Sequence, residues 1–189
     1  RLFGLPIAFK SLALFYNRDL VSSPPDTTDA LIAHASTLTD HTGEGRYGFV
    51  YENTKLYFHA PWIHGFGGHV IDQDGQLHID DAESIDALAF AGTLQRDHSL
   101  LPENVYSQTV TSLFNSGRAA MVMNGPWFRG EIDGVDWGVA ALPTISETGE
   151  PARPFLTVEA MLISAQSAHP DLAFSAVRWF ATDPEAVQI

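Results

Sequence analysis

The clearest hydrophobic pattern lies in the middle of the chain, where it predicts a helix followed by a buried strand. Val110, Leu113 and Phe114 recur at the i, i+3 and i+4 spacing of a helix that buries one face. Gly117 follows, and glycine readily adopts the left-handed conformation that ends many helices. The continuous apolar run from Ala119 to Met123 then suits a strand that is covered on both faces of an α/β sheet.

A sharp turn is predicted directly after this strand. Asn124 and Gly125 tolerate positive φ, and Pro126 fixes the next φ value. Trp127 is therefore expected to leave the sheet at the carboxyl end of the strand. Ligands of open α/β sheets bind at that edge, so the turn is a means of presenting a flat aromatic ring to a bound molecule.

Apolar and polar segments alternate along the rest of the chain and predict further elements. We expect helices around residues 31–38, 56–64, 81–94 and 172–180, and extended segments at residues 5–15, 47–51, 137–141 and 156–163. In the 81–94 helix, Ile85, Leu88 and Ala89 are expected to face inward. Asp74 and Gly75 predict a hairpin over residues 70–79, because Asp-Gly supplies the positive φ values of a tight turn.

Composition and charge narrow the function. The 189 residues suffice for one full α/β domain and are few for two. The formal net charge of −13, with ten Lys and Arg residues, argues against nucleic acid, which is bound by neutralising its phosphates. The absence of cysteine is compatible with an oxidising periplasm and with the cytoplasm. Apolar runs fall short of the roughly 20 residues that span a bilayer, and no signal peptide is visible.

Three segments, in order along the chain, resemble one known family. They are residues 5–8 with 12–19, residues 57–61 with Gly67 and Gly68, and residues 124–127 followed by 138–144 and 154–155. Together they resemble the solute-binding proteins of bacterial ABC importers, in the branch that includes maltose-binding protein. The resemblance implies an α/β, periplasmic-binding-protein-like (type II) fold that comprises mainly the second lobe plus pieces of the first.

The resemblance also implies domain boundaries and a partial chain. Residues 1–12 would cross the hinge as a strand of the first lobe, residues 13–150 would form the second lobe, and residues 151–189 would return to the first. Because family members carry a whole lobe before the hinge-like Pro6, we expect a piece of a longer protein, in which domain-swapped self-association of the fragment stays open. The family implies a periplasmic or extracytoplasmic location, with the protein either free or tethered through a fused permease or a lipid anchor.

The candidate site residues follow from sugar chemistry and from the resemblance. A pyranose packs its C–H face on an aromatic ring and offers hydroxyls to polar groups, so Trp127 and Tyr57 are the aromatic candidates. Lys10 and Lys55 occupy positions where maltose-binding relatives have glutamates, and Glu52 is a nearby substitute. Both lysines are alternatively ordinary solvated residues. The other tryptophans, Trp62, Trp137 and Trp179, are interpreted as core residues, because large aromatics are mostly buried.

The predicted function is binding of an oligosaccharide, of maltose or maltodextrin type, by two-lobe closure for an ABC importer. Its partners would be the sugar and the transmembrane permease subunits, with no cofactor, metal or catalysis. Two alternatives remain. A carbohydrate-active enzyme would need two carboxylates about 5 to 10 Å apart, whereas helix capping and turns explain many of the acidic residues, such as Asp26, Asp81 and Asp133. A structural or truncated lobe would bind nothing by itself. His59, His64 and His69 lie five apart, which does not suit a helical zinc site.

Overall fold

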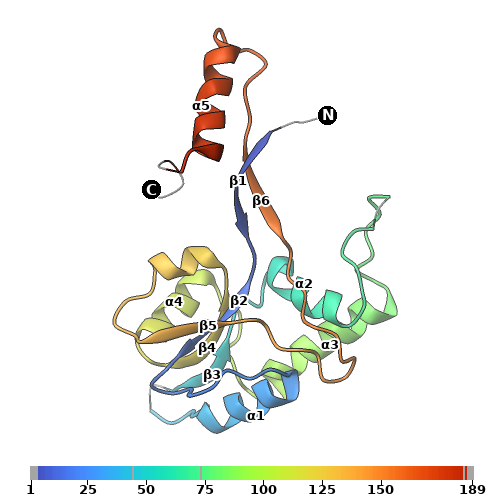
Figure 1. Ribbon diagram of the computed structural model, residues 1–189. Coiled ribbons are helices and arrows are strands. Elements are labelled where there is room, and N and C mark those ends of the chain that lie inside the picture. The colour runs from blue at the N-terminus through green and yellow to red at the C-terminus, as the bar shows by residue number, and fades with distance from the viewer. Residues whose placement is uncertain (1–3, 44, 73, 185, 187–189) are drawn as a thin grey trace. The chain divides into compact units, whose positions relative to one another are not determined.

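The computed structural model describes residues 4–43, 45–72, 74–184 and 186, and these fall into two compact units (Figure 1). The larger unit is Leu12–Phe155, and the smaller unit combines residues of 1–11 with residues of 156–189. In the larger unit the helices are α1 (Thr28–Leu38), α2 (Leu56–Gly65), α3 (Ala82–Arg96), α4 (Ser107–Asn115) and the 3₁₀-helix η1 (Pro126–Gly130). Its strands are β2 (Ala13–Asn17), β3 (Tyr47–Val50), β4 (Ala119–Asn124) and β5 (Trp137–Ala140).

A mixed four-stranded sheet forms the centre of the larger unit, in the order β3-β4-β2-β5. β3 runs parallel to β4, whereas β2 runs antiparallel to both β4 and β5. Every residue of β4 is buried, which confirms the strand predicted from its continuous apolar run. In the register of the sheet, Phe15 lies between Val122 and Val139. β4, one of the two inner strands of this sheet, therefore leads directly into the predicted turn.

Helix α4 and its end also follow the prediction. Val110, Leu113 and Phe114 are buried. The helix ends at Asn115, and Gly117 adopts a φ of 70°, in the left-handed region that glycine accepts without strain. The residues that determine this turn are all close together in the sequence, so the pattern alone was sufficient to place it.

Helix α1 packs directly on β3 through backbone contact. Thr27 caps the helix, because its hydroxyl accepts a hydrogen bond from the N–H of Ala30 at 3.2 Å. Leu31 and Ala35 of this helix are fully buried. A Cβ atom added to Gly48 of β3 would lie 2.0 Å from the carbonyl oxygen of Ala35, so the strand and the helix can approach this closely only at a glycine.

The prediction of which side of α3 is buried is wrong. Ile85 and Leu88 are 55% and 41% exposed, and Ala89 is also exposed. The buried positions are instead Ser84, Ala87, Ala91 and Leu94. Three of these side chains are small, and α3 uses them to lie close to α2. The choice of face was decided by the shape of the neighbouring helix rather than by hydrophobicity.

The segment between α2 and α3 extends away from both helices (Figure 1). Gly75 has a φ of 78°, as expected for the Asp74-Gly75 turn. Ladder pairing is limited to a single antiparallel bridge between Ile71 and Leu77, so the predicted hairpin is only a turn with one bridge; Gln73 lies outside the described residues. Asp72 organises the turn, because its Oδ1 accepts hydrogen bonds from the N–H groups of Asp74 and Gln76, at 2.9 and 2.8 Å.

The smaller unit contains β1 (Leu5–Lys10), β6 (Thr157–Met161) and α5 (Pro170–Thr182). β1 and β6 pair antiparallel, with an irregularity between Pro6 and Ala8. Trp179 of α5 is 44% exposed in the part of the chain described, so its interpretation as a core residue is wrong. In the larger unit Trp62 is fully buried, as predicted, and Trp137 is partly buried beside Phe15, with ring centroids 5.6 Å apart.

His59 makes the stability of the larger unit depend on pH. Burial lowers the pKa of His59, and its Nε2 lies 2.9 Å from the carbonyl oxygen of Asn53. In the unfolded chain the imidazole of His59 has a pKa of about 6.5 and binds a proton more readily than in the folded protein. The contribution of His59 to the free energy of unfolding is therefore fully present above pH 6.5 and decreases as the pH falls below this value. We expect the urea midpoint to be lower at pH 5 than at pH 7.5.

The matched control for this prediction is the exposed His34. His59→Gln should flatten the dependence between pH 5 and 7, whereas His34→Gln should leave it unchanged. The carboxyls of Asp40, Asp72 and Asp81 have pKa values held below the ordinary value of 3.8 by hydrogen bonds, so they act at lower pH. A dependence that survives in the His59→Gln variant would contradict the assignment.

Candidate functional site

The turn after β4 presents Trp127 as predicted. Asn124, the last residue of the strand, is buried, and its Oδ1 accepts a hydrogen bond from the N–H of Gly125 at 2.9 Å. Pro126 is the first residue of η1, where its fixed φ suits a helix start. Trp127 follows and is 38% exposed, in contrast to the fully buried Phe128 beside it. One aromatic residue of the turn therefore anchors it in the core and the other faces outward.

Gly125 determines where the indole of Trp127 lies. A Cβ atom added to Gly125 would lie 2.1 and 2.2 Å from two carbons of the six-membered ring of Trp127. The indole therefore packs directly on the backbone of Gly125. Glycine is needed here for this close approach, since the φ of Gly125 is −98°, which any residue can adopt. The ring is held in place by the backbone of its own turn.

Tyr57, the second aromatic candidate, lies beside Trp127. It is the second residue of α2 and is half-buried. Its ring centroid is 6.3 Å from that of Trp127, with the ring planes inclined at 45°. The structure thus brings together the two aromatic residues that were predicted from the sequence, although they lie 70 positions apart in the chain. Among the described residues, the buried hydroxyl of Tyr57 has no hydrogen-bond partner.

Two further rings extend this pair. Phe155 stacks on Tyr57 with ring centroids 6.0 Å apart and planes at 29°. The imidazole of His64, near the end of α2, meets Phe155 edge-on at 5.2 Å. His64 Nδ1 lies 2.7 Å from the carbonyl oxygen of Arg153, which favours the tautomer that carries a proton on Nδ1. We call Trp127, Tyr57, Phe155 and His64 the aromatic row.

Glu52 and Lys55 form an ion pair at the start of α2. Lys55 Nζ lies 2.7 Å from Glu52 Oε1. The two ends of the pair differ, because Glu52 is 5% exposed and Lys55 is mainly exposed. Lys55 is the N-cap residue of α2 and Tyr57 follows two positions later. A largely buried carboxylate and an exposed ammonium group are therefore fixed close in sequence to the aromatic row.

Lys10 lies in the smaller unit, at the end of β1. Its Nζ is 2.5 Å from Glu159 Oε1 on the paired strand β6. This ion pair accounts for a lysine at a position where the resemblance led us to expect a glutamate. Of the five predicted site residues, the structure brings Trp127 together with Tyr57 and Glu52 together with Lys55.

Sequence reasoning did not identify Phe155 and His64 as members of the site. Phe155 belonged to a segment that carried the family resemblance, so that segment held a usable signal. His64 was considered only as a metal ligand. Among the described residues, no group of three His, Asp or Glu side chains is placed to hold a metal ion. His64 instead contributes an aromatic edge and a backbone contact.

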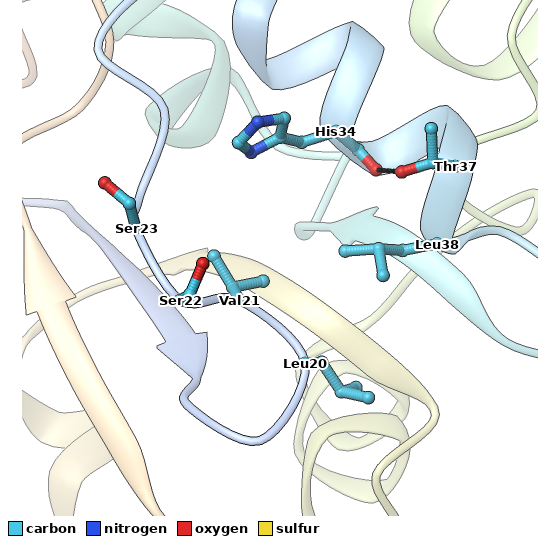
Figure 2. A pocket seen from close by; sticks show the side chains of 7 residues that line it. All are labelled: Leu20, Val21, Ser22, Ser23, His34, Thr37 and Leu38. Atoms are coloured by element: carbon cyan, nitrogen blue, oxygen red, sulfur yellow. Dashed lines mark hydrogen bonds between the residues drawn. The ribbon is translucent and has the colours of Figure 1, made fainter.

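A separate pocket of about 180 Å³ lies between α1 and the loop that follows β2. Figure 2 shows His34 of α1 facing the loop that carries Ser22 and Ser23. The hydroxyl of Thr37 donates to the carbonyl oxygen of His34 at 2.8 Å. None of the residues predicted for the site lines this pocket, so it adds nothing to the aromatic row.

The aromatic row is suited to recognition by packing. The exposed indole of Trp127 and the half-buried ring of Tyr57 offer flat apolar surface. The carboxylate of Glu52 and the ammonium group of Lys55, close to Tyr57 in the sequence, can accept and donate hydrogen bonds. A ligand with both a flat C–H face and a polar edge matches this combination. The row contains no nucleophile with an activating base beside it.

Comparison of the sequence with known families identifies the family of this chain. The family described as bacterial extracellular solute-binding protein matches residues 1–187. The chain belongs to this family. Among the described residues, no helix has the length and apolar character needed to cross a membrane.

Two curated relatives named for the sugars they bind are similar to this chain in sequence. The maltotriose-binding protein of Pyrococcus abyssi is 31% identical over 191 residues, which cover 98% of this chain and 41% of the relative. The galactooligosaccharide-binding protein of Bacillus subtilis is 27% identical over 187 residues, covering 92% of this chain and 44% of the relative. The chain spans less than half the length of these relatives.

Solved structures confirm the predicted α/β fold of the type II periplasmic-binding-protein class. A cyclo/maltodextrin-binding protein complexed with maltotetraose is 31% identical, with a TM-score of 0.83 over 99% of this chain and 49% of that one. The maltose/maltodextrin-binding domain MalE from Bdellovibrio bacteriovorus, bound to maltotriose, is 26% identical, with a TM-score of 0.82 over 98% of this chain and 51% of that one. The solute-binding chain thus matches about half of each structure.

Proposed function

We propose that this solute-binding chain contributes one face of an oligosaccharide-binding cleft that serves an ABC sugar importer. The observation that carries the proposal is the pairing of Trp127 with Tyr57, with ring centroids 6.3 Å apart, in a row of four aromatic rings. A single ring could serve any apolar ligand. A row of half-buried rings offers successive flat surfaces, which suits a chain of sugar units that each present a C–H face.

The larger unit supplies the aromatic surface and the polar partners in this proposal. Glu52 would accept hydrogen bonds from sugar hydroxyls, and Lys55 would donate to them. The buried hydroxyl of Tyr57, which has no partner among the described residues, offers a further donor and acceptor. In this proposal the larger unit belongs to the second lobe and Lys10, in the smaller unit, belongs to the first.

The chemistry proposed is binding and release without bond cleavage, on the extracytoplasmic side of the membrane, for delivery to the transmembrane permease subunits. The names of the relatives support an oligosaccharide as the solute and favour maltodextrins, since maltotriose and maltotetraose are named more often than galactooligosaccharide. Domain-swapped self-association of the 189-residue chain remains a prediction, which its mass in solution would check.

The test is calorimetric titration of the natural polypeptide that carries this sequence, and of the 189-residue chain alone. Maltotriose, maltotetraose and a galactooligosaccharide serve as ligands. We expect saturable heat with the maltodextrins and a weaker response from the 189-residue chain, because one lobe makes only part of the contacts. Chromatography of each mixture should return the sugar intact. Hydrolysed sugar would replace the proposal with an enzyme, and absence of heat from a folded protein would remove sugars as the solute.

A further inference from the structure

The turn between β3 and α2 carries the ion pair of Glu52 and Lys55, which the proposed function places against the sugar. The residues between the two partners are Asn53 and Thr54. The chain leaves the core along this turn, because Glu52 is buried, Asn53 is half-buried, and Thr54 and Lys55 are exposed. The direction of the Glu52 carboxylate at the edge of the core therefore depends on how the backbone of the turn is held.

The side chain of Asn53 attaches the turn to a neighbouring segment. Its Oδ1 accepts a hydrogen bond from the backbone N–H of Val105 at 2.9 Å. Val105 is fully buried in the segment before α4, and the residue before it, Asn104, has a φ of 51°. A positive φ is uncommon in residues other than glycine, although asparagine adopts it more readily than most. The backbone thus takes an uncommon conformation directly before the N–H group that Asn53 binds.

The backbone of Asn53 attaches the same turn to helix α2. The carbonyl oxygen of Asn53 lies 2.9 Å from Nε2 of His59. Since a carbonyl oxygen can only accept, Nε2 carries a proton and donates this hydrogen bond. The imidazole meets the fully buried ring of Tyr51 edge-on, with ring centroids 5.7 Å apart and planes at 81°. A ring packed against the core therefore holds the backbone of Asn53.

These two contacts fix the turn at the residue next to Glu52. Glu52 and Lys55 pair with each other, so their ion pair links the turn only to itself. Asn53 links it to α2 through one hydrogen bond and to the segment before α4 through another. Because Asn53 is covalently joined to Glu52, a change in the path of its backbone also changes the direction of the Glu52 side chain.

We propose that Asn53 is a positioning residue, which directs the carboxylate of Glu52 toward the sugar through its hydrogen bonds with His59 and Val105. The inference rests on the proposed function, in which Glu52 accepts hydrogen bonds from sugar hydroxyls. Asn53 acts before the sugar arrives and does not contact it. By removing the freedom of the turn in the free protein, it lowers the entropy that is lost when Glu52 binds the sugar.

A double-mutant cycle on the natural polypeptide tests whether Asn53 acts through Glu52. Asn53→Ala removes the acceptor for the N–H of Val105 and should raise the Kd for maltotriose roughly three- to tenfold, as expected for one lost hydrogen bond. Glu52→Gln keeps the length of the side chain and replaces its carboxylate. The double variant should bind maltotriose no more than about twofold more weakly than Glu52→Gln alone, because the two residues act as one unit. Calorimetric titration measures all four affinities.

Conservative substitutions test the two hydrogen bonds separately. Asn53→Asp keeps a side-chain oxygen that can accept from Val105, so it should bind maltotriose more tightly than Asn53→Ala. His59→Gln keeps an N–H donor for the carbonyl oxygen of Asn53 and should retain the parent affinity. His59→Phe keeps a ring in the core without the donor, and it should raise Kd by about as much as Asn53→Ala.

Thr39→Ala is the matched control for a general loss of stability. The hydroxyl of Thr39 accepts a hydrogen bond from the N–H of Gly48, near the start of β3, at 3.0 Å. Thr39 and Asn53 are both half-buried, and each substitution takes a side-chain acceptor from a backbone N–H. Both variants should lower the urea midpoint of the natural polypeptide, whereas only Asn53→Ala should weaken its binding of maltotriose.

The outcomes separate this inference from the proposed function. Parent affinity in a folded Asn53→Ala protein would overturn the positioning role and leave sugar binding in place. Additive losses in the cycle would show that Asn53 acts independently of Glu52, which also contradicts the inference. An equal loss of affinity in Thr39→Ala would show that affinity merely follows stability, with the same consequence. If the unsubstituted polypeptide binds none of the sugars, the proposed function fails, and the role of Asn53 fails with it.

Discussion

Replacing Trp127 with alanine is expected to weaken maltodextrin binding by the natural polypeptide by about 1 to 3 kcal/mol, which is roughly a 5- to 150-fold rise in Kd. The indole is the most accessible ring at the end of β4, and it packs beside Tyr57. Its removal takes away a flat surface for the sugar and leaves the core intact, since the buried Phe128 still anchors the turn. Calorimetric titration with maltotriose measures the change.

Two controls separate stacking from a general loss of structure. Trp127→Phe keeps an aromatic plate and should retain part of the affinity. Val139→Ala removes a comparably exposed apolar side chain on β5 and should change neither affinity nor stability measurably. Unaltered affinity in a folded Trp127→Ala protein would remove Trp127 from the site.

The substitution Gly125→Ala tests the role of Trp127 in sugar binding without changing Trp127 itself. The Cβ atom of Gly125→Ala would lie about 2 Å from ring carbons of Trp127, so the ring must move away from the backbone of the turn. Affinity should therefore fall in Gly125→Ala although Trp127 is still present, and the tryptophan fluorescence spectrum should shift. Normal binding by this variant would show that the position of the indole on the turn is unimportant for the sugar.

The largest effect on stability is expected for Gly48→Ala, at about 3 kcal/mol or more. The added methyl group would lie 2.0 to 2.4 Å from the carbonyl oxygen, Cα and carbonyl carbon of Ala35. All three are backbone atoms of α1, so no change of rotamer can relieve the contact, and the helix must shift away from β3. Urea unfolding of the 189-residue chain, followed by far-UV circular dichroism, measures the loss.

The chain offers clean controls for this substitution. Gly130→Ala adds the same methyl group where no atom lies within 4 Å, and φ there is not positive, so it should be close to neutral. Adding Ala35→Gly to Gly48→Ala should not restore stability, because the clashing atoms belong to the backbone. Rescue by Ala35→Gly would show that the side chain of Ala35, and not the path of α1, limits the approach.

The candidate site was only partly accessible from the sequence. The turn at residues 124–127 was predicted because its signals are local: an apolar run, then glycine and a proline with fixed φ. The positive φ allowed for at Asn124 and Gly125 is not used, since Gly125 has a φ of −98° and serves the close approach of the indole. The resemblance to sugar-binding relatives then selected Tyr57. Phe155 lies in a segment that carries the family resemblance, but its ring contact with Tyr57 at 6.0 Å and that of His64 with Phe155 at 5.2 Å are decided by folding.

The sequence by itself determined the order of elements, the buried strand β4, the end of α4 at a left-handed glycine and the turn that exposes Trp127, because short-range backbone preferences and hydrophobic periodicity specify such features. Only the tertiary structure decided which side of α3 is buried. Hydrophobicity pointed to Ile85 and Leu88, yet close packing against α2 required the small side chains of Ala87 and Ala91 on the inner side. Packing depends on the shape of the neighbouring surface, which a residue's own sequence context does not contain.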